Sequence, residues 1–179
     1  MRRRTMFVLL AVVPAVVVMT TAISGCGSKK KHVRSELSSP RCTVSQLRGH
    51  AIPGGAAAGT VFFSVALSNT GAPCWLAGYP SLRIKGAHGL LPTHVIHGGA
   101  DLLNGAPKRV RVANIRRASV LVSYEDVPVG KERTCPVGEA ILLRPPGTKA
   151  WLTIKFGTGA CGHVTLHTSP VLAGVHSSR

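Results

Sequence analysis

Short runs of alternating apolar and polar residues, divided by turn-forming residues, constrain the fold of this chain more than any other feature. In residues 60–69 (TVFFSVALSN), Val61, Phe63, Val65 and Leu67 fall on one face of an extended strand. Similar short alternations recur at 82–85, 109–112, 118–124, 139–144, 151–156 and 164–168. No segment has a sustained helical period with caps. Seven or more short strands therefore predict an all-β, antiparallel β-sandwich.

Residues typical of turns separate the expected strands. They occur at 69–71, 86–89, 104–105, 126–130 and 145–147. The Gly/Ala-rich stretch 50–59 (HAIPGGAAAG) predicts a flexible loop before the first long strand. In the run after Ala150, we expect Leu152, Ile154 and Phe156 to point inward.

The N-terminal segment has the three parts of a secretory signal in order. Three arginines at 2–4 precede an apolar run at 7–18, and residues 23–26 read ISGC. These last four residues resemble the lipobox of bacterial lipoproteins, which is an aliphatic residue, two small residues and a cysteine. In that family the cysteine receives a diacylglycerol and the signal is cut before it. The resemblance implies a signal peptide at 1–25, lipidation of Cys26 and a location on the extracytoplasmic face of the cell membrane.

Two other interpretations of this segment stay open. Residues 6–23 approach the length that spans a bilayer, so the segment is alternatively an uncleaved anchor, although Pro14 and the adjacent Thr20 and Thr21 weaken a permanent helix. It is also compatible with an ordinary secretory signal followed by an incidental cysteine. Cleavage before Cys26 leaves 154 of the 179 residues, which suits one domain with its own core.

The remainder divides into three parts. We expect the lipidated cysteine and a basic tether at 26–40, the sandwich domain at 41–175 and a tail at 176–179. The tether carries three lysines at 29–31 and Arg34. These charges either lie on anionic headgroups or keep a linker solvated.

The cysteines outside the lipobox form an even set. They are Cys42, Cys74, Cys135 and Cys161. In an exported chain an even set predicts two disulfides, and four cysteines allow three connectivities that the sequence cannot choose between. We favour Cys42–Cys74 and Cys135–Cys161, which join neighbours along the chain. In the chain-entropy description each loop stabilises the fold by about 3–4 kcal/mol. We expect no zinc site, since no CxxC occurs.

The charge is strongly positive. The formal net charge of +16 falls to +13 when the three arginines at 2–4 are removed. Such an excess favours phospholipid headgroups, acidic wall polymers or acidic proteins as surroundings. Nucleic acid is not an expected partner, because the chain is exported and the basic residues lack interleaved aromatic residues.

Basic side chains occupy outward positions of the expected strands or their ends. They are Arg83, Lys85, Arg109, Arg111, Arg116 and Arg117. If two of these strands are neighbours, the side chains form one positive face that binds an anionic glycolipid, a wall polymer or an acidic partner. The alternative is a solvated face that keeps the sandwich soluble and guards its edges.

Residues suited to catalysis or metal binding are sparse. Glu125 and Asp126 are adjacent on a strand and point opposite ways, and no nucleophile elbow or phosphate-binding glycine loop occurs. On a strand, His94 and His97 (with Asp101 nearby) face opposite sides. His163 and His167 share a face, but lie about 13 Å apart on an extended strand. We therefore expect no catalytic residue, no metal and no cofactor.

Several segments, in this order, are similar to an exported actinobacterial family known as domain of unknown function 4232. The matching parts are Cys42, 62–71 (FFSVALSNTG), 73–84 (PCWLAGYPSLRI), Cys135, 142–147 (LLRPPG), Cys161 and 169–171 (SPV). The resemblance implies an immunoglobulin-like sandwich with two disulfides, often on lipoproteins, and no activity. Within 73–84, Gly78 and Pro80 suit a turn, and we expect the Tyr79 hydroxyl to find a backbone hydrogen-bond partner.

Together these features predict an exported, lipid-anchored, non-catalytic envelope lipoprotein that binds an anionic envelope component. The alternative is a structural accessory that scaffolds a membrane-protein partner. A hydrolase or metal-binding protein is less favoured.

Overall fold

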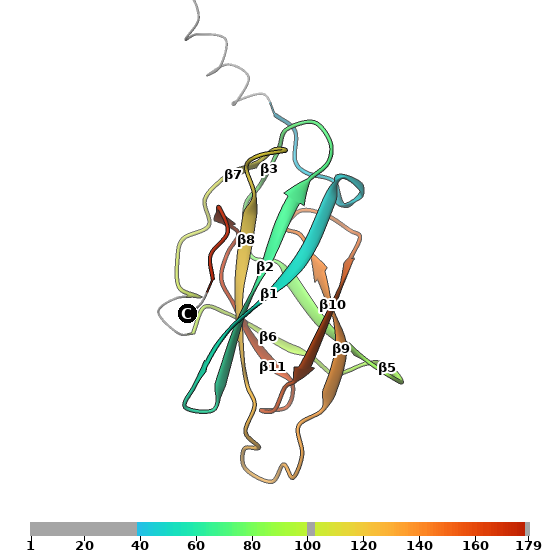
Figure 1. The fold of residues 1–179 in the computed structure, drawn as a ribbon, viewed down its shortest axis with the longest axis vertical. Coiled ribbons are helices and arrows are strands. Elements are labelled where there is room, and N and C mark those ends of the chain that lie inside the picture. Colours follow the sequence, from blue (N-terminus) through green and yellow to red (C-terminus); the bar gives the residue numbers. More distant parts are fainter. Residues whose placement is uncertain (1–38, 100–102, 178–179) are drawn as a thin grey trace, which may run out of the picture.

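The computed structural model describes residues 39–99 and 103–177. The predicted signal peptide at 1–25, Cys26, most of the tether and Asp101 lie outside the described residues. Within them, every regular element is a β-strand except a short 3-10 helix, η1 (Val44–Gln46). The expected fold class, an immunoglobulin-like β-sandwich with two disulfides, is confirmed (Figure 1).

The larger sheet has six strands. It comprises β1 (Leu47–Ala57), β2 (Thr60–Asn69), β8 (Ala118–Glu125), β11 (Thr165–Thr168), β6 (His94–His97) and β12 (Leu172–Ala173). The order is β1-β2-β8-β11-β6, and β12 pairs with β8 beside β11. The pairing is antiparallel except between β6 and β11, which run parallel. The prediction of a wholly antiparallel sandwich is wrong at this one edge.

Two smaller sheets complete the structure. The four-stranded sheet has the order β10 (Leu152–Gly159), β9 (Val137–Arg144), β4 (Ser81–Gly86) and β5 (Gly89–Leu90). The two-stranded sheet pairs β3 (Cys74–Leu76) with β7 (Val110–Val112). The pair β3–β7 lies at the end of the sandwich where the described chain begins, at the top of Figure 1.

The core follows the alternation of the sequence. Phe63, Val65 and Leu67 of β2 are fully buried, and they meet Leu82 and Ile84 of the opposite sheet in one hydrophobic cluster. Ile154 points inward as expected. Burial of these aliphatic and aromatic side chains is the main favourable term, at about 1.5–3 kcal/mol for each.

Strand β8 departs from simple alternation, because every residue from 118 to 124 is buried. It lies in the middle of its sheet, with β2 on one edge and β11 and β12 on the other. Both faces of β8 are covered, so small polar residues such as Ser119 and Ser123 are buried as well as Val120 and Val122.

The prediction of a loop at 50–59 is wrong. Most of this stretch belongs to β1, which pairs with β2 from Leu47 to Ala57 with a bulge between Pro53 and Ala56. The chain turns at Ala58 and Gly59, both with positive φ. The long partner strand supplies hydrogen bonds that outweigh the low strand propensity of glycine and alanine.

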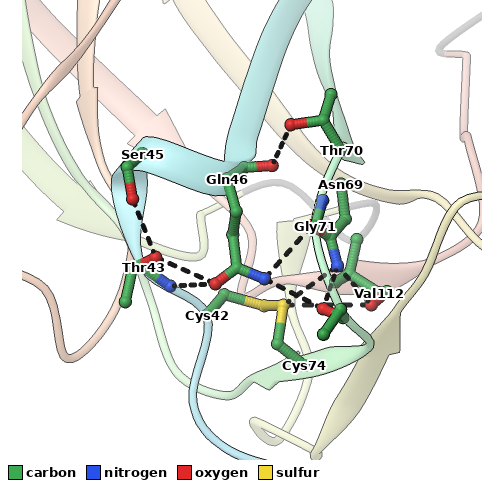
Figure 2. Close-up of a disulfide and its surroundings, with 10 residues drawn as sticks. Cys42, Thr43, Ser45, Gln46, Asn69, Thr70, Gly71, Cys74 and Val112 are labelled. Carbon is green, nitrogen blue, oxygen red and sulfur yellow. Dashed lines mark hydrogen bonds between the residues drawn. A yellow bond between two sulfur atoms is a disulfide. The ribbon is translucent and has the colours of Figure 1, made fainter.

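A buried asparagine holds the upper corner of the sandwich (Figure 2). Asn69 is 2% exposed, and its Nδ2 donates to the carbonyl oxygens of Ala72 at 2.7 Å and Val112 at 3.1 Å. Its Oδ1 accepts from Gly71 N at 2.8 Å and from Gln46 Nε2 at 3.1 Å. One side chain therefore ties η1, the end of β2 and the end of β7 together.

The disulfide Cys42–Cys74 closes the same corner, with 4.9 Å between its Cα atoms. Asn69 Nδ2 lies 3.4 Å from Cys74 Sγ, so the amide and the disulfide pack directly against each other (Figure 2). Gln46 extends the network, because its Oε1 accepts from the backbone N and the hydroxyl of Thr43. The favoured connectivity Cys42–Cys74 is confirmed.

The second disulfide, Cys135–Cys161, lies towards the other end and confirms the other favoured pairing. It joins the 126–136 loop to the turn before β11. Glu132 reinforces this link, because its carboxylate accepts from the backbone N of His163 at 2.7 Å, of Gly162 at 2.9 Å and of Val129 at 3.1 Å. His163 has a positive φ of 58°, which is unfavourable outside glycine, so this carboxylate holds a strained turn.

Replacing Asn69 should destabilise the domain. Asn69→Ala removes the side-chain donor to the buried Val112 O, one of two donors to Ala72 O and the acceptor of Gly71 N, and we expect a loss of about 2–4 kcal/mol in the free energy of unfolding. The near-isosteric Asn69→Asp removes the same donors without a cavity and should cost a similar amount. Denaturant unfolding under oxidising conditions measures both values. The exposed neighbour Thr70→Ala is the control, and equal stability of the Asn69→Ala and Thr70→Ala proteins would refute the role of the amide.

The Glu132 hydrogen bonds should make stability depend on acidity. The N–H groups of His163, Val129 and Gly162 hold the pKa of Glu132 below its ordinary value of 4.5. A lowered folded-state pKa stabilises the protein above pH 4.5, and this contribution is lost as the pH falls through the lower value. Glu132→Gln should therefore melt earlier than wild type at neutral pH. The difference in Tm should shrink on acidification, and a constant difference would contradict this assignment.

Candidate functional site

The six basic residues expected to form one face are distributed over two sheets. Arg83 and Lys85 lie on β4, whereas Arg111 lies on β7 and Arg109 immediately precedes it. The other two, Arg116 and Arg117, follow β7 in the turn to β8. Because β4 and β7 belong to different sheets, the six side chains do not line neighbouring strands. Four of the chain's arginines instead gather around its two tryptophans.

The first cluster is centred on Trp75 of β3. The guanidinium carbons of Arg41 and Arg109 each lie 4.1 Å from the centroid of its ring. The backbone sets this arrangement, since Arg41 forms an isolated bridge with Trp75 and Arg111 is its partner on β7. A cation over an indole ring is attracted by the ring electrons, so each guanidinium is held in place.

The second cluster is centred on Trp151, directly before β10. Here Arg83 of β4 and Arg144 of β9 lie 4.8 and 4.9 Å from the ring centroid. Arg144 is also the register partner of Ser81 and donates from Nη2 to the Ser81 hydroxyl at 2.9 Å. Strand pairing therefore brings arginines that are 61 positions apart in the chain to the same ring.

Sequence reasoning missed Arg41 and Arg144 as members of these clusters. Both contacts are made across strands, and no local motif places an arginine on a distant tryptophan. Only the composition could have indicated these clusters, because the chain has two tryptophans and 22 lysines and arginines. A tryptophan on the surface of so basic a domain is a favourable place for a guanidinium group to stack.

The stacked arginines carry charge that no carboxylate among the described residues neutralises. Within residues 39–99 and 103–177, no ion pair involves Arg41, Arg83, Arg109 or Arg144, and of their side chains only that of Arg144 donates a hydrogen bond. Stacking uses the faces of the planar groups and leaves their N–H edges available. An immobilised guanidinium edge matches the geometry of a phosphate or carboxylate, which accepts two parallel hydrogen bonds.

An open pocket of about 470 Å³ lies between residues 41–45 and 147–150, beside the first cluster. One wall is 41–45, which includes Arg41 of the first cluster, and the other is 147–150, which ends beside Trp151 of the second. Lys149 adds a further positive charge, and the hydroxyl-bearing Thr43 and Ser45 line the first wall. We call Arg41, Trp75, Arg83, Arg109, Arg144, Lys149 and Trp151 the basic end.

Gly147 shapes this pocket. It has a positive φ of 76°, and a Cβ there would come within 2.7 Å of Arg41 Nη1. A side chain at 147 would therefore strain the turn and displace Arg41, so the glycine of the PPG turn allows the close approach of the arginine.

The described carboxylates lie at the end of the sandwich opposite the basic end. The acidic residues that the structure describes are Glu125, Asp126, Glu132 and Glu139. All four lie between the end of β8 and the start of β9, around the 126–136 loop at the bottom of Figure 1. By register Glu125 is opposite Thr60, beside the β1–β2 turn, whereas Ala118 at the other end of β8 is opposite Leu67. In the described part of the chain, the two signs of charge are therefore separated, and no carboxylate compensates the positive charge of the basic end.

Tyr79, His97 and His167 make contacts that belong to the fold. Tyr79 stacks on His97 with ring centroids 4.2 Å apart, and its hydroxyl donates to Gly105 O at 2.9 Å, which confirms the expected backbone partner. His167 Nδ1 lies 3.1 Å from Gly98 O. Among residues 39–99 and 103–177, no three His, Cys, Asp or Glu side chains come close enough to hold one metal ion.

In the described part of the chain, no helix has the length and hydrophobicity needed to cross a membrane. Comparison with curated proteins and with solved structures finds no match. The family model described as "Domain of unknown function (DUF4232)" matches residues 42–172, from the first disulfide cysteine to the start of β12. This match covers most of the chain and the whole hydrophobic core. The chain therefore belongs to the domain of unknown function 4232 family.

Proposed function

We propose that the protein is an exported, lipid-anchored envelope lipoprotein whose domain is a non-catalytic module that binds an anionic envelope component. The observation that carries the proposal is the basic end, where four arginines stack on two tryptophans without an ion pair among the described residues. The membrane anchor rests on the lipobox-like sequence at 23–26.

The ligand chemistry follows from the donors. Guanidinium edges and the Lys149 ammonium recognise phosphate or carboxylate oxygens through charge-assisted hydrogen bonds. Two clusters of stacked arginines, with Lys149 and an open pocket beside the first, suit a ligand with several anionic groups, such as a wall polymer or an array of lipid headgroups. Binding between exposed charges weakens as salt screens them.

A second candidate function is a scaffold for a membrane-protein partner. It is favoured by exposed valines at the end opposite the basic end, namely Val127, Val129 and Val137, the last 71% exposed. Val127 and Val129 line an open pocket of about 330 Å³ beside the β1–β2 turn. Exposed apolar surface of this kind suits contact with another protein.

Lipidation is tested by Cys26→Ala in the native host. Loss of the acceptor thiol should move the protein from the membrane fraction to the medium or the soluble envelope fraction, because two acyl chains supply the attachment. Fractionation with immunodetection measures the distribution. Ser28→Ala, two residues further on, is the matched control and should stay with membranes. Unchanged membrane retention of the Cys26→Ala protein would refute the proposed lipid anchor.

The basic end is tested with poly(glycerol phosphate) as a soluble wall-polymer probe. Trp75 and Trp151 are the only tryptophans of the chain, so ligand binding should change the intrinsic fluorescence. The double variant Arg41→Ala/Arg109→Ala should bind at least about tenfold more weakly, because it removes two charge-assisted donors.

The matched control is Lys131→Ala/Arg133→Ala, which removes the same charge from the 126–136 loop. It should retain nearly wild-type affinity, and added salt should weaken wild-type binding. Equal losses in the two double variants would show that only net charge matters and would reject the basic end as the site.

A further inference from the structure

One large apolar side chain stands out from the surface near the basic end. Ile115 is 92% exposed, the highest value among the large hydrophobic residues of the described chain. It lies with Asn114 at the tip of a two-residue turn between β7 and β8. Two backbone hydrogen bonds between Ala113 and Arg116, at 2.9 and 3.0 Å, close this turn and fix the position of the tip.

The turn itself does not require an isoleucine. Neither Asn114 nor Ile115 has a positive φ, so the turn does not demand a particular side chain at either central position. A β-branched side chain at the second position makes no packing contribution when it is 92% exposed. Its exposure to water is unfavourable, so an apolar environment outside the domain would accommodate it better.

Basic residues precede and follow the tip in the sequence. Arg116 and Arg117 follow it and are exposed, and Arg109 and Arg111 precede it on the β7 side. Arg109 also belongs to the Trp75 cluster. An aliphatic tip among arginines, next to a stacked tryptophan, has the composition of surfaces that lie in the interface of an anionic bilayer.

The chain enters the domain at this same end. Pro40 O accepts from Trp75 N, and the neighbouring Cys74 is the register partner of Val112, one residue before the turn. Between Cys26 and Ser39 lie twelve residues, 27–38. Fully extended, a segment of this length reaches about 40 Å, so an anchor at Cys26 keeps the tip near the bilayer.

We propose that the domain docks on the anionic membrane that holds its anchor, with Ile115 inserted into the interface and the basic end on the headgroups. This deepens the proposed function and relies on it for the tether. A hydrated wall polymer offers no apolar phase for an aliphatic side chain, whereas the acyl boundary of a bilayer does. The pairing of an isoleucine tip with arginines therefore favours the bilayer as the occupant of this surface.

The test uses the full lipidated protein in vesicles, so that the anchor holds it on the bilayer whether or not the domain docks. Ile115→Trp adds a fluorophore at the tip, and Val137→Trp adds one at the opposite end; the quenching of Trp75 and Trp151 is measured in the wild-type protein and subtracted. In phosphatidylglycerol vesicles with brominated acyl chains, the tryptophan at 115 should be quenched strongly. The tryptophan at 137 should not be, and high salt or pure phosphatidylcholine should reduce the quenching at 115.

Equal quenching at the two positions, or none at 115, would overturn membrane docking. The outcome is separable from the proposed function, because Ile115→Ser should leave the affinity for poly(glycerol phosphate) unchanged. If the tryptophan at 115 is not quenched but polymer binding is intact, the proposed anion binding is retained and only membrane docking is refuted. Weaker polymer binding by the Ile115→Ser protein would contradict the separate role assigned to the tip.

Discussion

The corner formed by Asn69 and the disulfide Cys42–Cys74 is the constraint on which the rest of the structure depends. It joins η1, the end of β2, β3 and the end of β7, which otherwise share few long backbone pairings. The buried amide satisfies carbonyl oxygens and N–H groups from separate segments and packs against the sulfur. Because β3 carries Trp75, and Arg41 directly precedes Cys42, the same corner positions the first arginine–tryptophan cluster.

Concentrating arginines at one end of a small domain is electrostatically unfavourable in isolation, since like charges repel and the carboxylates lie at the other end. Stacking on Trp75 and Trp151 offsets part of this cost and fixes the guanidinium planes. A solvating surface would be served as well by flexible lysines, which need no ring to hold them. The ordered arginines therefore support a surface organised for an oxyanion.

Much of the fold could be predicted from the sequence, because the alternating apolar side chains at 63, 65, 67, 82 and 84 are all buried in the core, although Ser64 and Ala66 are buried too. Cysteine order supported the right connectivity. Three features could not be predicted from the sequence, because they depend on pairing and packing between distant segments. The stretch 50–59 is a strand because β2 pairs with it, β8 is buried on both faces by segments distant in sequence, and β6 is parallel to β11.

The basic end was harder to predict than the fold. Sequence analysis identified Arg83 and Arg109, yet their partners Arg144 and Arg41 come from other strands and become visible only with the register. The most direct measurement is a nuclear magnetic resonance titration of the isotope-labelled protein with poly(glycerol phosphate). The indole N–H signals of Trp75 and Trp151 and the Nε–H signals of their arginines should shift first, and salt should reverse the shifts. Shifts centred on the 126–136 loop, or spread evenly over the domain, would contradict this account.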